Sequence, residues 1–101
     1  MIEKNENKRN TKNALLFNQL CDFIADKFLR EPKNQKGETV SQNVYAKSVG
    51  LSSSTISKIK HPKEDYSLPL STIYSICRYE KYPLSRLFKE FEDKYGVDIP
   101  E

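Results

Sequence analysis

The sequence predicts an all-α fold in which five helices pack around one core. Glycine occurs only three times in the 101 residues, and β-branched runs are short. No stretch alternates apolar and polar residues over many positions, as a half-buried strand would. Apolar residues instead recur at spacings of three and four, which is the period of one helix face. The length fits a single small domain with a modest core.

The first helix is predicted to begin at Asn13 and to end before Pro32, because the residue before a proline avoids helical geometry. Residues 1–12 contain almost no apolar side chains and are therefore expected to form a disordered arm. Residues 32–40 read as a polar loop that turns at Gly37. The apolar stripe of the first helix consists of Leu16, Leu20, Phe23, Ile24 and Phe28.

Two short helices joined by a tight turn follow this loop. Ser41 is a good N-cap for the second helix, and Gly50 ends it, because glycine readily adopts the left-handed conformation that closes a helix. Ser52 is expected to cap the third helix, which spans residues 52–60 and stops before Pro62. The residues expected to be buried here are Val44, Tyr45, Ala46, Val49, Ile56 and Ile59.

A fourth helix begins near Leu70, after a loop at residues 61–69, and Pro83 separates it from a fifth helix that ends at Gly96. The domain is therefore expected to span residues 13–96, followed by a frayed tail at residues 97–101. Apolar stripes predict that the fourth helix buries Ile73, Ile76 and Cys77, and that the fifth presents Leu84, Leu87, Phe88, Phe91 and Tyr95.

The cysteines and the single histidine give no sign of a metal or cofactor site. Cys21 and Cys77 lie far apart, in two apolar segments, and read as reduced core residues. His61 has no cysteine close to it in sequence, so no zinc site is expected. The polar N-terminus lacks an apolar stretch, so we expect neither a secretory signal nor a membrane span, and a cytoplasmic location.

Charge is distributed unevenly along the chain. Residues 27–63 carry eight basic and two acidic side chains, a net charge of +6, whereas residues 64–101 have a net charge of −3. The basic block coincides with the two short helices at residues 41–60. A basic block that coincides with a structural motif indicates a polyanionic partner.

The run from Ser41 to Lys60 has the layout of a helix-turn-helix, in which the second helix lies in the DNA major groove. The two helices must approach closely near the turn, which the small side chain of Ala46 and the freedom of Gly50 allow. With the two isoleucines facing inward, the helical period predicts an outer face without acidic groups. That face comprises Ser53, Ser54, Ser57 and Lys58.

Residues 39–88 resemble the lambda-repressor-like, or Xre-type, helix-turn-helix family of bacterial and phage regulators. The matching positions are Ser41-Gln42, Ala46, Gly50-Leu51-Ser52 and 54–59, followed by 70–73, 76–77 and 84–88. The resemblance implies a five-helix DNA-binding domain, and a transcriptional regulator, a repressor, that binds specific sequences in double-stranded DNA. Three features depart from the family pattern. The connection between the first two helices is longer, Lys60 and Pro62 stand where an acidic residue and a glycine are common, and the loop before the fourth helix is extended.

The resemblance implies base contacts from Ser53, Ser54, Thr55 and Lys58, and a phosphate contact from Gln42. The helical period adds Ser57, and phosphate contacts are expected from Lys60, His61 and Lys63. Hydroxyl groups both donate and accept hydrogen bonds and so discriminate weakly between bases, which leaves Lys58 as the only long donor on this face. Binding is therefore expected to depend on phosphates and DNA shape more than on direct base readout.

An antitoxin-type protein-interaction module, in which DNA binding is secondary, is the alternative from another class. Phe88, Phe91 and Tyr95 exceed what so small a core needs, and they could hold a protein partner. The same surplus predicts a homodimer through the last helix. No enzyme is expected, because the serines at 52–54 have no histidine or paired acid nearby in sequence.

Overall fold

A computed structural model describes the backbone of residues 2–96 and the side chains of residues 13–96. This part of the chain is all-helical, as predicted, and residues 97–101, the expected tail, lie outside it. The elements are α1 (Ile2–Ile24), its π-helical continuation η1 (Ala25–Leu29), α2 (Gln42–Val49), α3 (Ser53–Lys60), α4 (Leu70–Glu80) and α5 (Leu84–Tyr95).

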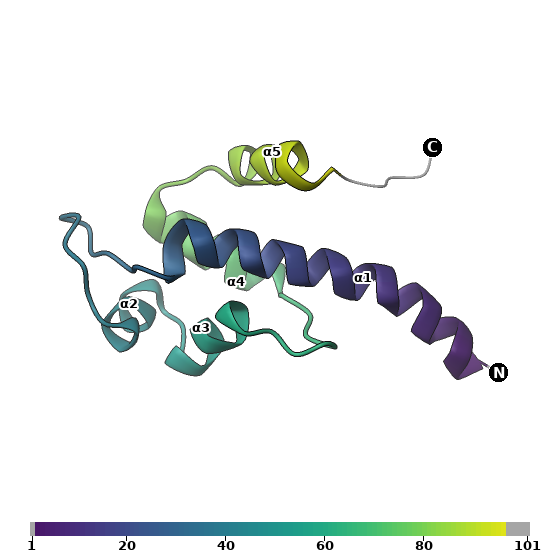
Figure 1. Cartoon of the computed structure of the whole chain (residues 1–101). Coiled ribbons are helices and arrows are strands. Elements are labelled where there is room, and N and C mark those ends of the chain that lie inside the picture. Colours follow the sequence, from purple (N-terminus) through teal and green to yellow (C-terminus); the bar gives the residue numbers. More distant parts are fainter. Residues whose placement is uncertain (1, 97–101) are drawn as a thin grey trace.

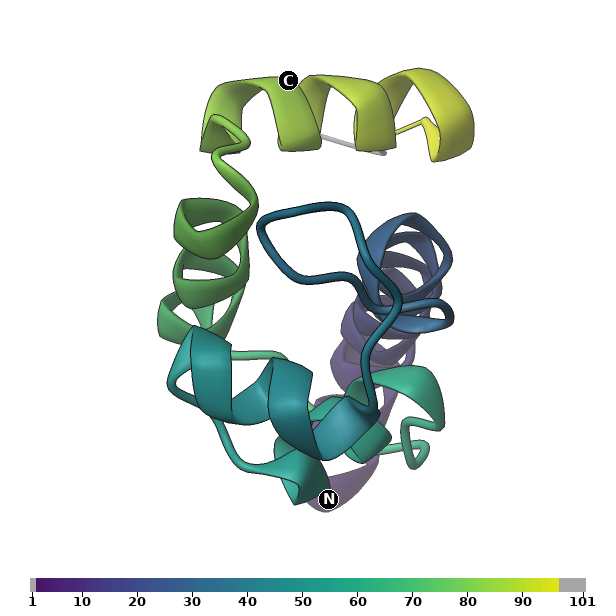
Figure 2. The same ribbon diagram turned by 90° about the vertical axis from the view of Figure 1, so that its left-hand side faces the viewer.

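The long helix α1 is the centre of the arrangement. Figure 1 shows α5 along one side of it, α2 and α3 along the other, and α4 crossing behind it. Figure 2 shows the same arrangement: α1 and α4 lie side by side, α5 lies across one end of this pair, and α2 and α3 lie at the other end. The helix-turn-helix pair is therefore separated from α5 by the body of the fold.

Helix α1 begins at Ile2, so the predicted start at Asn13 is too late and the backbone of residues 2–12 is helical where a disordered arm is expected. No glycine or proline occurs before Pro32, so nothing in this segment stops a helix from propagating toward the N-terminus. At the other end the helix widens into the π-turn η1, in which the Arg30 N–H donates to the Ala25 carbonyl at 3.0 Å. It ends just before Pro32, as predicted.

Most of the predicted apolar residues are buried in the core or packed against it, and two are exposed. Leu16 is 39% exposed. Val44 is 51% exposed, because Tyr45 and Ala46 take the inward positions of α2. The buried set is Leu20, Cys21, Phe23, Ile24, Ala25, Leu29, Tyr45, Ala46, Ile56, Ile59, Leu68, Ile73, Ile76, Cys77, Leu87 and Phe91. No helix in the described part of the chain is both long and apolar enough to cross a membrane.

Both cysteines are free and buried, which confirms their predicted place in the core. Burial disfavours the thiolate and raises the pKa of Cys21 to about 11. Burial also raises the pKa of Tyr45, whose hydroxyl donates a hydrogen bond of 2.7 Å to the carboxylate of Glu80. This bond ties α2 to α4.

Residues 32–40, predicted as a polar loop, form a hairpin with a single β-bridge between Lys33 and Thr39. The Asn34 side-chain oxygen accepts hydrogen bonds from the backbone N–H groups of Lys36 (2.9 Å) and Glu38 (3.0 Å). Gln35 donates from its side chain to the Tyr79 carbonyl at 2.7 Å, which anchors the hairpin on α4. The sequence gives the turn but not this anchor, because the two partners are 44 positions apart.

The apolar stripe of α5 packs onto α1. Phe91 is only 4% exposed, and its ring meets Phe23 edge to face at 5.7 Å, while Tyr95 meets the same ring at 6.2 Å. Lys27 forms an ion pair with Glu90 at 3.0 Å, and the Tyr82 hydroxyl donates to the same carboxylate. These two donors lower the pKa of Glu90 to about 2, and the hydrogen bond from Tyr82 contributes most to this shift.

The expectation of an uncovered apolar surplus on α5 is therefore wrong, because Phe23 supplies the partner surface within the chain. The homodimer through Phe88, Phe91 and Tyr95 stays a prediction, but without the exposed surface on which it was based. Phe88 and Tyr95 are half-buried against the core.

Gly50 makes the turn between α2 and α3 with φ of +90° and ψ of 26°, in the left-handed region. Its N–H donates to the Ala46 carbonyl at 3.0 Å, and the Leu51 N–H donates to the same oxygen at 2.9 Å. The predicted helix end and the close approach at Ala46 are confirmed, since Ala46 is buried.

Gly50→Val is expected to lower the free energy of unfolding by about 1–3 kcal/mol, because a β-branched residue is strained at positive φ. A Cβ atom at this position would meet no atom within 4 Å, so the cost is one of backbone conformation and not of collision. Gly50→Asn is the matched control, since asparagine tolerates the left-handed region and should lose much less. Urea denaturation of both variants checks this, and equal losses would show that conformation is not the cause.

Candidate nucleic-acid interface

Serine side chains cap both helices of the predicted helix-turn-helix. The Ser41 hydroxyl oxygen accepts from the Val44 N–H at 3.2 Å, and the Ser52 hydroxyl oxygen accepts from the Thr55 N–H at 3.1 Å. Each cap satisfies a backbone donor that a helix N-terminus leaves without a partner. Both predicted N-caps are confirmed, and they fix where α2 and α3 begin.

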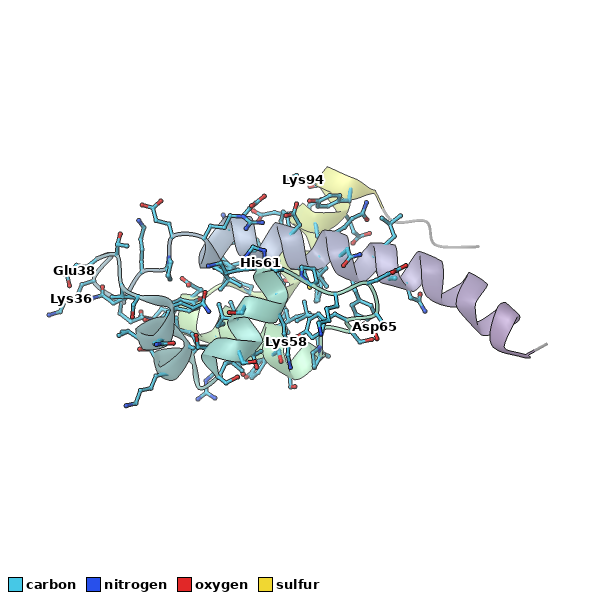
Figure 3. The ribbon with its side chains drawn as sticks, turned by 60° about the horizontal axis from the view of Figure 1, so that its bottom comes forward. Lys36, Glu38, Lys58, His61, Asp65 and Lys94 are labelled. Atoms are coloured by element: carbon cyan, nitrogen blue, oxygen red, sulfur yellow. The ribbon has the colours of Figure 1, made fainter. Side chains whose placement is uncertain are left out.

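Helix α3 presents three different faces. Ile56 and Ile59 point into the core and are 1% and 0% exposed, as predicted. The opposite side of the helix carries Ser54 and Lys58, four residues apart, and His61 follows three residues later. We call Ser54, Lys58 and His61 the outer stripe. All three are exposed, and Figure 3 shows Lys58 and His61 on the side of the molecule on which α3 lies.

The third face of α3, formed by Ser53, Ser57 and Lys60, turns toward the first residue of α2. The Gln42 side-chain nitrogen donates to the Ser53 hydroxyl (3.0 Å), the Ser53 carbonyl (3.0 Å) and the Ser57 hydroxyl (2.8 Å). The Lys60 ammonium in turn donates to the Gln42 side-chain oxygen at 3.0 Å. We call Gln42 and these three residues the Gln42 cluster.

The Gln42 cluster changes the interpretation of four predicted DNA contacts. The amide nitrogen of Gln42 has two hydrogens for three acceptors, so both of its donors are used within the chain, and its oxygen accepts from Lys60. The side chain therefore has no donor left for a phosphate. Ser53 is half-buried and not on the outer side, which corrects its predicted placement. Ser57 is exposed, but its hydroxyl is hydrogen-bonded to Gln42.

Two backbone donors remain open at the N-terminus of α2. Within the described part of the chain, the N–H groups of Gln42 and Asn43 have no hydrogen-bond acceptor, whereas that of Val44 is capped by Ser41. Free N–H groups at the positive end of a helix dipole form a favourable site for a phosphate. The backbone N–H of Gln42 can therefore donate a hydrogen bond to a phosphate, although its side-chain amide donates to Ser53 and Ser57.

The remaining predicted residues divide between the cap and the loop after α3. The Thr55 hydroxyl lies 2.9 Å from that of Ser52, and Thr55 is half-buried, so it belongs to the cap. Lys63, in the loop beyond α3, and Lys47, on α2, are both exposed. No carboxylate in the described residues lies within ion-pair distance of Lys47, Lys58 or Lys63. Glu64 and Asp65, both exposed, follow directly in the loop and end the run of basic residues.

Sequence reasoning missed the Gln42 cluster, although a signal for it exists. Ser53, Ser57 and Lys60 are spaced by four and three, which is the spacing of one polar ridge on a helix. The residue of α2 that contacts this ridge is Gln42, and only the geometry of the turn at Gly50 brings it opposite the ridge. Periodicity within one helix cannot show side-chain contacts between residues that lie 11 to 18 positions apart on two different helices.

Comparison with known proteins found no match: no family model, no curated protein and no solved structure is similar to this chain. The Xre-type resemblance therefore stays a prediction that rests on the motif residues and on the geometry of α2, Gly50 and α3.

Proposed function

We propose that this protein binds double-stranded DNA with α3 in the major groove and regulates transcription as a repressor. The observation that supports this most is the outer stripe of α3. It is exposed, carries no acidic group, lies opposite two buried isoleucines, and belongs to a helix held to α2 by a left-handed glycine turn. The major groove of B-DNA admits one α-helix, and helix-turn-helix proteins place their second helix there.

In this arrangement Ser54 and Lys58 face base edges, while the open N–H groups at the start of α2 meet the phosphate backbone. His61 and Lys63, just beyond the helix, are placed to reach neighbouring phosphates. The Gln42 cluster supports the pair by keeping α2 and α3 at a fixed angle. Repression then follows from occupancy, because a protein bound across a promoter excludes polymerase from it.

Sequence readout is expected to be weak. The hydroxyls of Ser53 and Ser57 accept hydrogen bonds from Gln42 within the chain, and Ser53 is half-buried, so direct contacts fall mainly to Ser54 and Lys58. A serine hydroxyl accepts or donates to any base, and lysine favours guanine only through a single charged group. The antitoxin-type alternative was based on an apolar surplus in α5, and since Phe91 is buried against α1, no observation favours it.

Selection of bound duplexes from a random library, followed by titration of the selected duplex at several salt concentrations, tests the proposal. We expect log affinity to fall linearly with log salt, with a slope of about −2 to −4 for two to four phosphate contacts. The ratio of specific to nonspecific affinity should lie near the low end of about 10³–10⁷. A salt-independent affinity would contradict DNA binding by this face, and the absence of any enriched sequence would contradict sequence-specific binding.

A further inference from the structure

A pocket of about 360 Å³ opens where the hairpin, the end of α2 and the second half of α4 meet. These three segments lie next to one another on the side of the molecule that faces the viewer in Figure 2. None of the residues proposed to contact DNA lines this pocket. Its volume is within the range of about 300–1,000 Å³ that is usual for small-molecule sites.

The charged groups that line the pocket are both cationic. Arg78, in the last turn of α4, and Lys81, directly after the helix, contribute to its wall, and no carboxylate does. Within the described side chains neither cation forms an ion pair. Glu80 lies between them in sequence and is half-buried, but its carboxylate accepts a hydrogen bond from the hydroxyl of the buried Tyr45 and does not line the pocket.

Helix ends could offset these positive charges, because α2 and α4 both finish beside the pocket and carbonyl groups are partly negative. Several of these carbonyls already have donors. Tyr82 N–H donates to the Cys77 carbonyl (2.8 Å), Lys81 N–H to the Arg78 carbonyl (3.3 Å), and Gln35 to the Tyr79 carbonyl (2.7 Å). Two full positive charges therefore exceed the partial negative charge of the helix ends.

Two tyrosines give the same pocket an aromatic wall. Tyr74 is 53% exposed, a high value for a large ring in a small domain. Tyr79 is half-buried and is held edge to face against Tyr45, with ring centroids 5.4 Å apart. Within the described residues neither the Tyr74 nor the Tyr79 hydroxyl has a hydrogen-bond partner. A planar ring that stacks on Tyr74 would cover its exposed face.

We propose that this pocket binds a small aromatic anion, a molecule in which a planar ring carries a phosphate or carboxylate group. Arg78 and Lys81 pair with the anionic group, to which a guanidinium can donate two parallel hydrogen bonds, and Tyr74 stacks on the ring. A nucleoside monophosphate combines the required groups. This site is separate from the outer stripe of α3, and the proposal does not depend on DNA binding.

Isothermal titration of the full chain with adenosine monophosphate, in the absence of DNA, tests the proposal. We expect a dissociation constant of about 1 mM or lower, and at least about tenfold weaker binding for Arg78→Gln. Tyr74→Ala should weaken binding about fivefold, since stacking on an aromatic ring contributes roughly 1–3 kcal/mol per base. Lys89→Gln is the matched control, because it removes one exposed positive charge from α5 and should leave binding unchanged.

Adenosine and inorganic phosphate separate the two halves of the ligand, and each should bind at least about tenfold more weakly than the monophosphate. Amide chemical shifts should move at Ser48, Tyr74 and Arg78 and not along α5. The proposal is overturned if wild-type protein does not bind the monophosphate, or if Arg78→Gln binds it equally well. Equal binding of inorganic phosphate would overturn the aromatic part, because no ring would then be needed.

Discussion

Lys58→Glu is expected to reduce affinity for a selected duplex by at least about 100-fold. Lys58 is the only long donor of the outer stripe, and loss of a base-edge contact alone costs about 1–3 kcal/mol. A glutamate at this position adds repulsion from the phosphates on both sides of the groove. The fold should be unaffected, because the Lys58 side chain is exposed and has no ion-pair or hydrogen-bond partner in the described part of the chain.

A mobility-shift titration at fixed salt measures this effect, with circular dichroism as the check on folding. Lys89→Glu provides the same change in net charge on α5, on the far side of α1 from α3 (Figure 1), and should alter affinity only slightly. A folded Lys58→Glu protein with wild-type affinity would remove α3 from the interface. An equal loss in both variants would show that net charge, and not this face, governs binding.

Phe91→Ala is expected to lower the free energy of unfolding by about 3–5 kcal/mol, the usual cost of truncating a buried phenylalanine. Phe91 is 4% exposed and packs edge to face on Phe23, so its removal leaves a cavity between α5 and α1. For a domain of this size such a loss is a large fraction of total stability. Urea denaturation monitored by circular dichroism gives the value directly, and Phe88→Ala, at a half-buried position of the same helix, should cost less.

The same variant decides between a core role and an interface role for α5. In a core role, the unfolding midpoint of Phe91→Ala does not depend on protein concentration, and wild type and variant have the same mass in sedimentation. In an interface role, the variant is well folded but loses a dimer that the wild type forms, and its stability depends on concentration. The second result would support the predicted homodimer through α5 and contradict the packing of Phe91 on Phe23.

Local signals in the sequence predict much of this fold. Ser41, Gly50 and Ser52 mark the ends of α2 and α3, because capping and left-handed geometry depend on a few neighbouring residues. Periodicity likewise predicts the burial of Ile56 and Ile59. The start of α1 is missed, because a polar segment without glycine or proline carries no signal that distinguishes a continuing helix from a disordered arm.

The errors at the site have a different cause. The helical period places Ser53 and Ser57 near the outer side of α3, but it cannot show where α2 lies against the third face. Phe91 is misjudged for a similar reason, since the surface of α1 that covers it contributes Phe23 from 68 positions earlier in the chain. In both cases the deciding contact joins two helices, and the pattern within one helix carries no information about the other.

The Gln42 cluster has a consequence for the entropy of association. A free glutamine or lysine side chain loses rotamer freedom worth up to about 1.5–2 kcal/mol when it is immobilised, and interfaces built from flexible side chains meet that cost at the moment of binding. Here Gln42 and Lys60 are already held by hydrogen bonds of 3.0 Å or less in the free protein. In the proposed complex with DNA, their ordering is complete before a duplex arrives, so α2 and α3 would enter the groove as one rigid body, and Ser54, Lys58, His61 and Lys63 would remain to be immobilised.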